Sequence, residues 1–153
     1  KEEAKVADLA ASLGVLGRNF EMLGRIPKKD MPKVLAGADV ATSLFIPLAA
    51  MEANSANKFF DGLAAGCCVA INYGGWQAEL LRKSGAGIRL DRNPLVAARQ
   101  LGDLVDNREL FERSKAAARR LAVSRFSRDE LARQLEQVLR GAVDVRFFDH
   151  LAD

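Results

Sequence analysis

Cysteine and histidine are scarce in this sequence, and their scarcity excludes two classes of protein. The two cysteines, Cys67 and Cys68, are adjacent, and the single histidine is His150. A disulfide between adjacent residues is strained, so we expect reduced thiols and a cytoplasmic protein rather than a disulfide-stapled secreted domain. Metal sites of the zinc type need three or four His, Cys or carboxylate ligands, so we also expect no bound metal.

Long apolar runs and a strong excess of charge are missing as well. No stretch approaches the roughly 18 apolar residues that span a membrane, and the chain opens on charged residues rather than on a signal peptide. The net charge of +3 is too small to indicate a nucleic-acid partner. Hydrophobic content of 49% and charged content of 28% are typical of a globular protein. We therefore expect one globular domain at residues 1–140, followed by a tail at residues 141–153.

Strand and helix patterns alternate along most of the chain. Apolar spacing predicts helices at residues 1–13, 28–37, 56–65, 77–84, 94–105, 108–123 and 128–139. Short β-rich runs predict strands at residues 19–24, 39–45, 69–72 and 87–90, the second of them buried on both faces. This alternation predicts a parallel α/β sheet, whose ligands bind outside the carboxyl ends of the strands. The loops at residues 25–27, 45–57 and 73–76 are therefore the candidates for function.

The helix predicted at residues 56–65 carries the clearest candidate site. Ser55 is the expected N-cap and Gly66 the expected C-terminal stop. One arc of the helix is apolar and is expected to enter the core, namely Phe59, Phe60, Leu63 and Ala64. The other arc holds Asn57, Lys58, Asp61, Gly62 and Ala65 beside a helix N-terminus, which suits a phosphate group. The pattern alone favours the plainer interpretation, an amphipathic surface helix with solvated charges.

A resemblance to a known family changes this balance. Residues 55–66 read Ser-Ala-Asn-Lys-Phe-Phe-Asp-Gly-Leu-Ala-Ala-Gly and resemble the donor-binding segment of retaining GT-B glycosyltransferases of family 4, in the branch that builds bacterial surface polysaccharides. Residues 20–27, 35–40 and 85–88 continue the likeness, which covers about residues 1–140. The resemblance implies a Rossmann-like parallel sheet with flanking helices and a helical C-terminal end, the C-terminal half of a GT-B fold. It also implies that two βα units and an acceptor domain are missing at the front.

The resemblance implies transfer of a sugar from a nucleotide-sugar, expected to be UDP-linked, to a lipid-linked or polysaccharide acceptor. The nucleotide-sugar is then a substrate, and no cofactor or metal is expected. A role in lipopolysaccharide or capsule biosynthesis would place the protein in the cytoplasm, in peripheral contact with the membrane. This chain alone is expected to be inactive, and an open sheet edge would let it pair with a second copy.

Asp61 occupies the place of the second acid in the family's pair of acidic residues. The resemblance implies that its carboxylate accepts hydrogen bonds from the ribose hydroxyls. The first acid would fall on Ala53, which is a departure, and Glu52 lies one position away. This departure puts in doubt how the hydroxyls of the transferred sugar are held.

The resemblance gives the remaining site residues their roles. Lys58 would stabilise the leaving diphosphate and so carry the catalytic contribution of this domain, together with the amides of Ser55, Ala56 and Asn57. The backbone of Arg25 and Ile26 would read the base, although Arg25 is equally well interpreted as a surface residue. Gly74 and Gly75 would flank the donor or else form a turn. Trp76 and the two cysteines are interpreted as packing residues.

Two other functions stay open from the sequence. A nucleotide-sugar epimerase of the same fold would need further acid and base residues near the sugar, and a non-catalytic α/β binding module would need none. Basic residues outnumber acidic ones in residues 108–140, which would suit a membrane surface. Interleaved glutamates and aspartates favour a solvated helix face instead.

Overall fold

The computed structural model describes residues 2–149, and the chain divides into two compact units, residues 1–31 and residues 32–153. The first unit holds helix α1 (Glu2–Ser12), a turn closed by a single bridge between Leu16 and Phe20, and a segment without regular structure. The strand predicted at residues 19–24 is wrong. A strand needs a ladder of backbone hydrogen bonds to a neighbour, and this segment makes one isolated bridge while Phe20 and Leu23 stay exposed.

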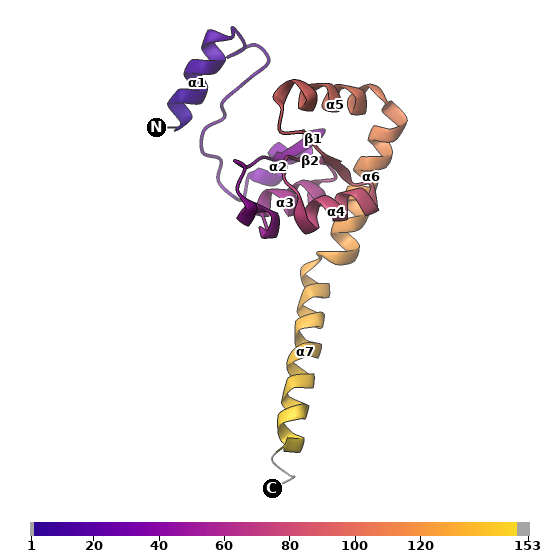
Figure 1. The fold of residues 1–153 in the computed structure, drawn as a ribbon. Helices are drawn as coiled ribbons and strands as arrows, with labels where there is room; N and C mark the ends of the chain where they lie inside the picture. Colours follow the sequence, from indigo (N-terminus) through magenta and orange to yellow (C-terminus); the bar gives the residue numbers. More distant parts are fainter. Residues whose placement is uncertain (1, 150–153) are drawn as a thin grey trace. The chain divides into compact units, whose positions relative to one another are not determined.

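The second unit alternates strands and helices in the predicted order (Figure 1). Helix α2 (Met31–Ala36) leads into strand β1 (Val40–Ser43), and a short 3-10 helix η1 (Ala49–Ala53) precedes helix α3 (Asn57–Ala65). Strand β2 (Cys68–Ile71), helix α4 (Gly75–Ser84) and strand β3 (Gly87–Arg89) follow, and then helices α5 (Pro94–Asp106), α6 (Arg108–Arg125) and α7 (Arg128–Asp149). The predicted helices and the last three predicted strands are confirmed.

The three strands form one parallel sheet in the order β1-β2-β3. Val40 pairs with Cys68, and Val69 with Gly87, so the carboxyl ends of all three strands reach the same edge. Side chains alternate across β2, as the period of two requires. Val69 and Ile71 pack in one cluster with α3, α4 and α6, whereas Cys68 packs in a second cluster with α5 and the start of α6. Helices thus cover both faces, as in Rossmann-like α/β domains.

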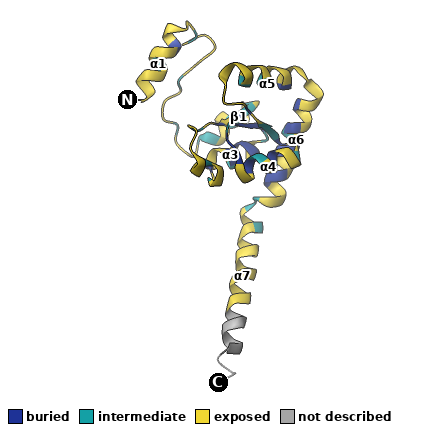
Figure 2. Cartoon of the chain, in the orientation of Figure 1, coloured by how far each residue is buried: buried dark blue, intermediate teal, exposed yellow. Residues whose placement is uncertain are grey.

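Burial within the second unit follows this arrangement (Figure 2). All four residues of β2 are buried, but Thr42 of β1 is exposed. The prediction that this strand is buried on both faces is therefore wrong, because β1 lies at the edge of the sheet with an uncovered side chain on one face.

Helix α3 differs from its predicted pattern at both its start and its buried face. Its N-cap is Ala56, so Ser55 is not the cap. Gly66 closes the helix in the left-handed conformation, as predicted. Phe59 and Leu63 are buried as predicted, but Gly62 is buried and Ala64 is exposed. Gly62 faces the sheet because α3 packs so closely on β1 that a residue without a side chain is needed there.

The C-terminal end is helical, and α7 continues to Asp149. The predicted boundary between residues 140 and 141 therefore falls inside α7, and residues 150–153 of the predicted tail lie outside the described residues. Across the part of the chain that the structure describes, every helix is too short or too polar to cross a lipid bilayer.

Candidate functional site

The candidate site lies at the edge of the sheet where the parallel strands end, the usual place for ligands in such folds. The loops after β1, β2 and β3 meet at this edge. Helix α6 instead contacts residues at the starts of the strands, since Lys115 donates to Asp39 at 2.8 Å and Ser114 contacts Cys68. The Lys115 ammonium lowers the pKa of Asp39. Lys115 and Ser114 of α6 therefore lie toward the opposite edge of the sheet, where the strands begin.

The N-terminus of α3 opens toward this edge without a side-chain cap. The N-cap residue Ala56 is extended and has no side chain that could accept a hydrogen bond. Phe59 N–H donates to the Ala56 carbonyl, whereas the amides of Asn57 and Lys58 belong to the first turn, where helices leave donors unpaired. Together with the helix dipole, these amides form a site for an anion.

Lys58 and Asp61 both project from α3 into solvent, as the sequence predicted. The Lys58 ammonium lies 5.7 Å from the centre of the Phe45 ring, within the range of a cation–π contact. Neither Lys58 nor Asp61 has a hydrogen-bond or ion-pair partner among the described residues, although they are three residues apart on one helix. A cation and a carboxylate on one helix turn are thus both available to a ligand.

Phe45 is held in place by the loop that follows β2. Phe45 N–H donates to Asn72 Oδ1 at 2.8 Å, and Asn72 Nδ2 donates to the Phe45 carbonyl at 3.0 Å. The Tyr73 ring lies 5.0 Å from the Phe45 ring, centre to centre. Neither Asn72 nor Phe45 was predicted as a site residue from the sequence, although a polar residue at the end of a buried strand could have indicated Asn72.

A small buried polar cluster holds Tyr73, the residue that packs against Phe45. The Tyr73 hydroxyl donates to Gln77 Oε1 at 2.6 Å and lies 3.2 Å from Ser43 Oγ. Burial raises the pKa of Tyr73, and the hydrogen bond with Ser43 opposes this increase. Gln77 Nε2 is buried and has no hydrogen-bond partner among the described residues. The cluster joins β1, the loop after β2 and α4.

Gly74 and Gly75 leave room for Glu52 of η1, and their predicted place beside the donor stays a prediction. A Cβ added to Gly75 would lie 2.0 Å from the Glu52 carbonyl oxygen, and one added to Gly74 would lie 3.0 Å from Glu52 Oε1. Trp76 Nε1 donates to the Asn54 carbonyl at 3.1 Å. These contacts bring Glu52 to the carboxyl edge. The Trp76 ring also lies 6.1 Å from the rings of Phe59 and Phe60, centre to centre.

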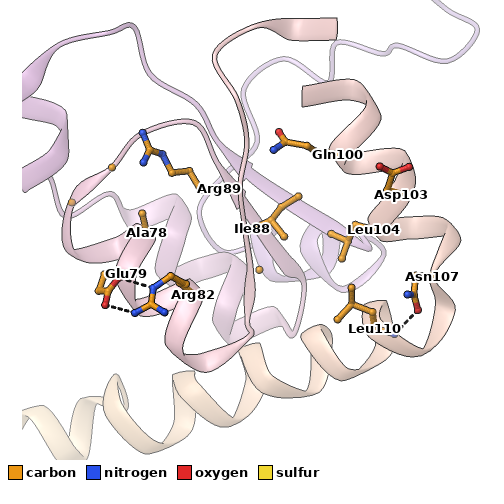
Figure 3. A pocket seen from close by; sticks show the side chains of 13 residues that line it. Ala78, Glu79, Arg82, Ile88, Arg89, Gln100, Asp103, Leu104, Asn107 and Leu110 are labelled. Atoms are coloured by element: carbon orange, nitrogen blue, oxygen red, sulfur yellow. Dashed lines mark hydrogen bonds and ion pairs between the residues drawn. The ribbon is translucent and has the colours of Figure 1, made fainter. Parts of the chain in front are cut away.

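Two hollows adjoin this edge on the side of β3. The larger, of about 850 Å³, has an apolar floor that includes Ala78, Ile88, Leu104 and Leu110 (Figure 3). The smaller, of about 660 Å³, is lined by Glu52, Arg89, Leu90, Asp91, Arg92 and Gln100. Gly74 and Gly75 line the larger hollow, but Lys58 and Asp61 line neither. The α3 group is therefore a separate part of the edge.

The other predicted residues are placed as follows. Arg25 is exposed and Ile26 is half-buried, and both belong to the first unit, whereas α3 belongs to the second. Their proposed contact with a base stays a prediction. Cys67 and Cys68 are free, buried thiols whose pKa values are raised by burial, as expected for packing residues. Within the described residues, no group of three or more His, Cys, Asp or Glu side chains could hold a metal ion.

Comparison with known proteins gives this Rossmann-like unit its class. The model of a family described as glycosyl transferase-like matches residues 4–152, which is nearly the whole chain. The chain therefore belongs to the glycosyl transferase-like family, and the predicted glycosyltransferase domain is confirmed at that level. A search of curated proteins found no match.

Proposed function

We propose that this chain is the donor-binding domain of a retaining GT-B glycosyltransferase of the family 4 type. It would transfer a sugar from a UDP-linked donor to a lipid-linked or polysaccharide acceptor. The observation that carries this proposal is the uncapped N-terminus of α3 at the carboxyl edge of the sheet, with the unpaired Lys58 ammonium in its first turn. The membership in the glycosyl transferase-like family supports it.

In the proposed mechanism, three groups on α3 bind different parts of the donor. The amides of Asn57 and Lys58 bind a phosphate oxygen, and the Lys58 ammonium compensates the charge that develops on the diphosphate as the glycosidic bond breaks. Ser55 and Ala56 contribute backbone at the same turn. Asp61, one turn further along, accepts hydrogen bonds from the ribose hydroxyls, which a carboxylate with two oxygens can accept together.

Calorimetric titration of UDP and UDP-sugars into the chain tests the proposal. Lys58→Ala should weaken UDP binding about tenfold or more, because charge-assisted hydrogen bonds contribute roughly 1.5–3 kcal/mol. Asp61→Ala should weaken the binding of both UDP and uridine, since both contain the ribose. Lys83→Ala is the matched control: it removes one exposed lysine at the end of α4 and should leave the affinity unchanged.

Two results would contradict the proposal. The first is the absence of UDP binding by the unsubstituted chain. The second is an equal loss of UDP affinity in Lys58→Ala and Lys83→Ala, since that result would show only a general effect of charge.

A further inference from the structure

Phe45 lies in a loop, but both of its backbone polar groups are hydrogen-bonded. Its backbone N–H and carbonyl both bond to the Asn72 side chain, at 2.8 and 3.0 Å. Only one orientation of the Asn72 amide satisfies both bonds, so the loop after β1 has a single register against the loop after β2. The next residue, Tyr73, packs its ring against the Phe45 ring at 5.0 Å.

Tyr73 is itself buried, and its hydroxyl is hydrogen-bonded with Gln77 and Ser43. Two consecutive residues therefore hold both the backbone and the ring of Phe45. The Lys58 ammonium lies over the same ring, 5.7 Å from the ring centre.

We propose that Asn72 and Tyr73 are positioning residues that make Phe45 a seat for the Lys58 ammonium at the N-terminus of α3. The inference rests on the proposed function of Lys58 as a ligand of the donor diphosphate. A lysine side chain has four rotatable bonds and loses conformational entropy when a ligand fixes it. The seat restricts the ammonium before the nucleotide arrives, so less of that entropy is lost on binding.

The first test needs no nucleotide. An aromatic ring shifts the proton resonances of a group held over its face. The proton chemical shift of the Lys58 ε-methylene should therefore differ from that of a lysine in an unstructured peptide. Phe45→Leu should abolish this difference, and Asn72→Ala should reduce it. Asn107→Ala is the control, because it removes a comparable bond, from Leu110 N–H to Asn107 Oδ1 at the start of α6, away from Lys58.

The second test is a double-mutant cycle on UDP affinity, measured by NMR titration. Asn72→Ala should weaken UDP binding about three- to tenfold in the unsubstituted chain and have little effect when Lys58→Ala is already present, because residues that act through one another are not additive. A purely structural role would give the same loss in both backgrounds. Asn107→Ala should leave the affinity unchanged in both.

The outcomes separate this inference from the proposed function. Failure of the unsubstituted chain to bind UDP, or an unchanged affinity in Lys58→Ala, overturns the proposed function and the inference with it. UDP binding that needs Lys58 but is unaffected by Asn72→Ala, or is lowered equally in both backgrounds, overturns the inference alone.

Discussion

Gly75 and Gly85 adopt nearly the same backbone conformation, but only Gly75 meets another part of the chain. Their φ angles are +80° and +69°. A Cβ on Gly75 would lie 2.0 Å from the Glu52 carbonyl oxygen, whereas one on Gly85 would have no atom within 4 Å. Replacing each glycine by alanine therefore separates two losses of stability, one from the left-handed backbone conformation and one from the steric contact.

Gly85→Ala should lower the free energy of unfolding by about 1–2 kcal/mol, the cost of a left-handed alanine. Gly75→Ala should cost more, because η1 must also move away. Urea denaturation of both variants measures the difference. Equal losses would show that η1 does not lie against Gly75.

The pKa of Glu79 gives a prediction about pH. Hydrogen bonds from Arg82 and Lys83 lower this pKa from 4.5 to about 2. A lowered folded-state pKa means that the stabilising contribution is complete above about pH 4.5 and is lost as the pH falls toward 2. Glu79→Gln should therefore be slightly less stable than the unsubstituted chain near pH 6, and the gap should close by about pH 2. Because the pair is exposed, the gap is small.

NMR titration of the Glu79 carboxyl carbon checks this expectation directly. A midpoint near the ordinary value of 4.5 would contradict the hydrogen bonds from Arg82 and Lys83 to the Glu79 carboxylate.

The properties of single residues were predictable where helix geometry determines them. The solvent side of α3 was correctly assigned for Asn57, Lys58 and Asp61, since angular position on a helix follows from spacing alone. Gly62 was assigned wrongly because its burial depends on how closely β1 approaches, which spacing does not contain. The Ser55 cap was wrong because α3 begins one residue later than the pattern suggested.

At the level of elements, α3 packs closely on β1. A Cβ on Gly62 would lie 2.7 Å from the Ala41 Cβ and 3.3 Å from a methyl group of Val69. Gly62→Ala should lower stability by about 1–3 kcal/mol through overpacking, although alanine is the better helix former.

Adding Ala41→Gly to Gly62→Ala should restore part of the lost stability, because it removes the atom nearest to the new methyl group. Thermal unfolding of the two single variants and the double variant gives the coupling. Strictly additive losses would contradict the packing of α3 on β1.

Most elements were predictable because helices and buried strands have distinct apolar periods. The exception, residues 19–24, makes one isolated bridge and no ladder with another strand among the described residues, and pairing cannot be seen in a local pattern. The bonds from Asn72 to Phe45 join residues 27 positions apart, so the most specific feature of the site lay outside the reach of sequence reasoning.

At the scale of the whole molecule, the predicted pairing with a second copy stays a prediction. Within the described residues, β1 and β3 each pair with β2 on one side. Open edges bind other strands, so light scattering should show a mass that rises with concentration. Thr42→Lys places a charge on the exposed position of β1 and should suppress this rise. A single monomer mass at all concentrations would contradict the expectation.

The central claim is that the donor diphosphate binds at the N-terminus of α3. Titration of UDP into isotopically labelled chain, followed by the backbone amide resonances, tests it most directly. If the diphosphate binds there, the largest chemical-shift changes fall on residues 56–58, with smaller ones at Asp61 and Phe45. Changes concentrated on the hollow lined by Ile88 and Leu104, with residues 56–58 unaffected, would contradict it.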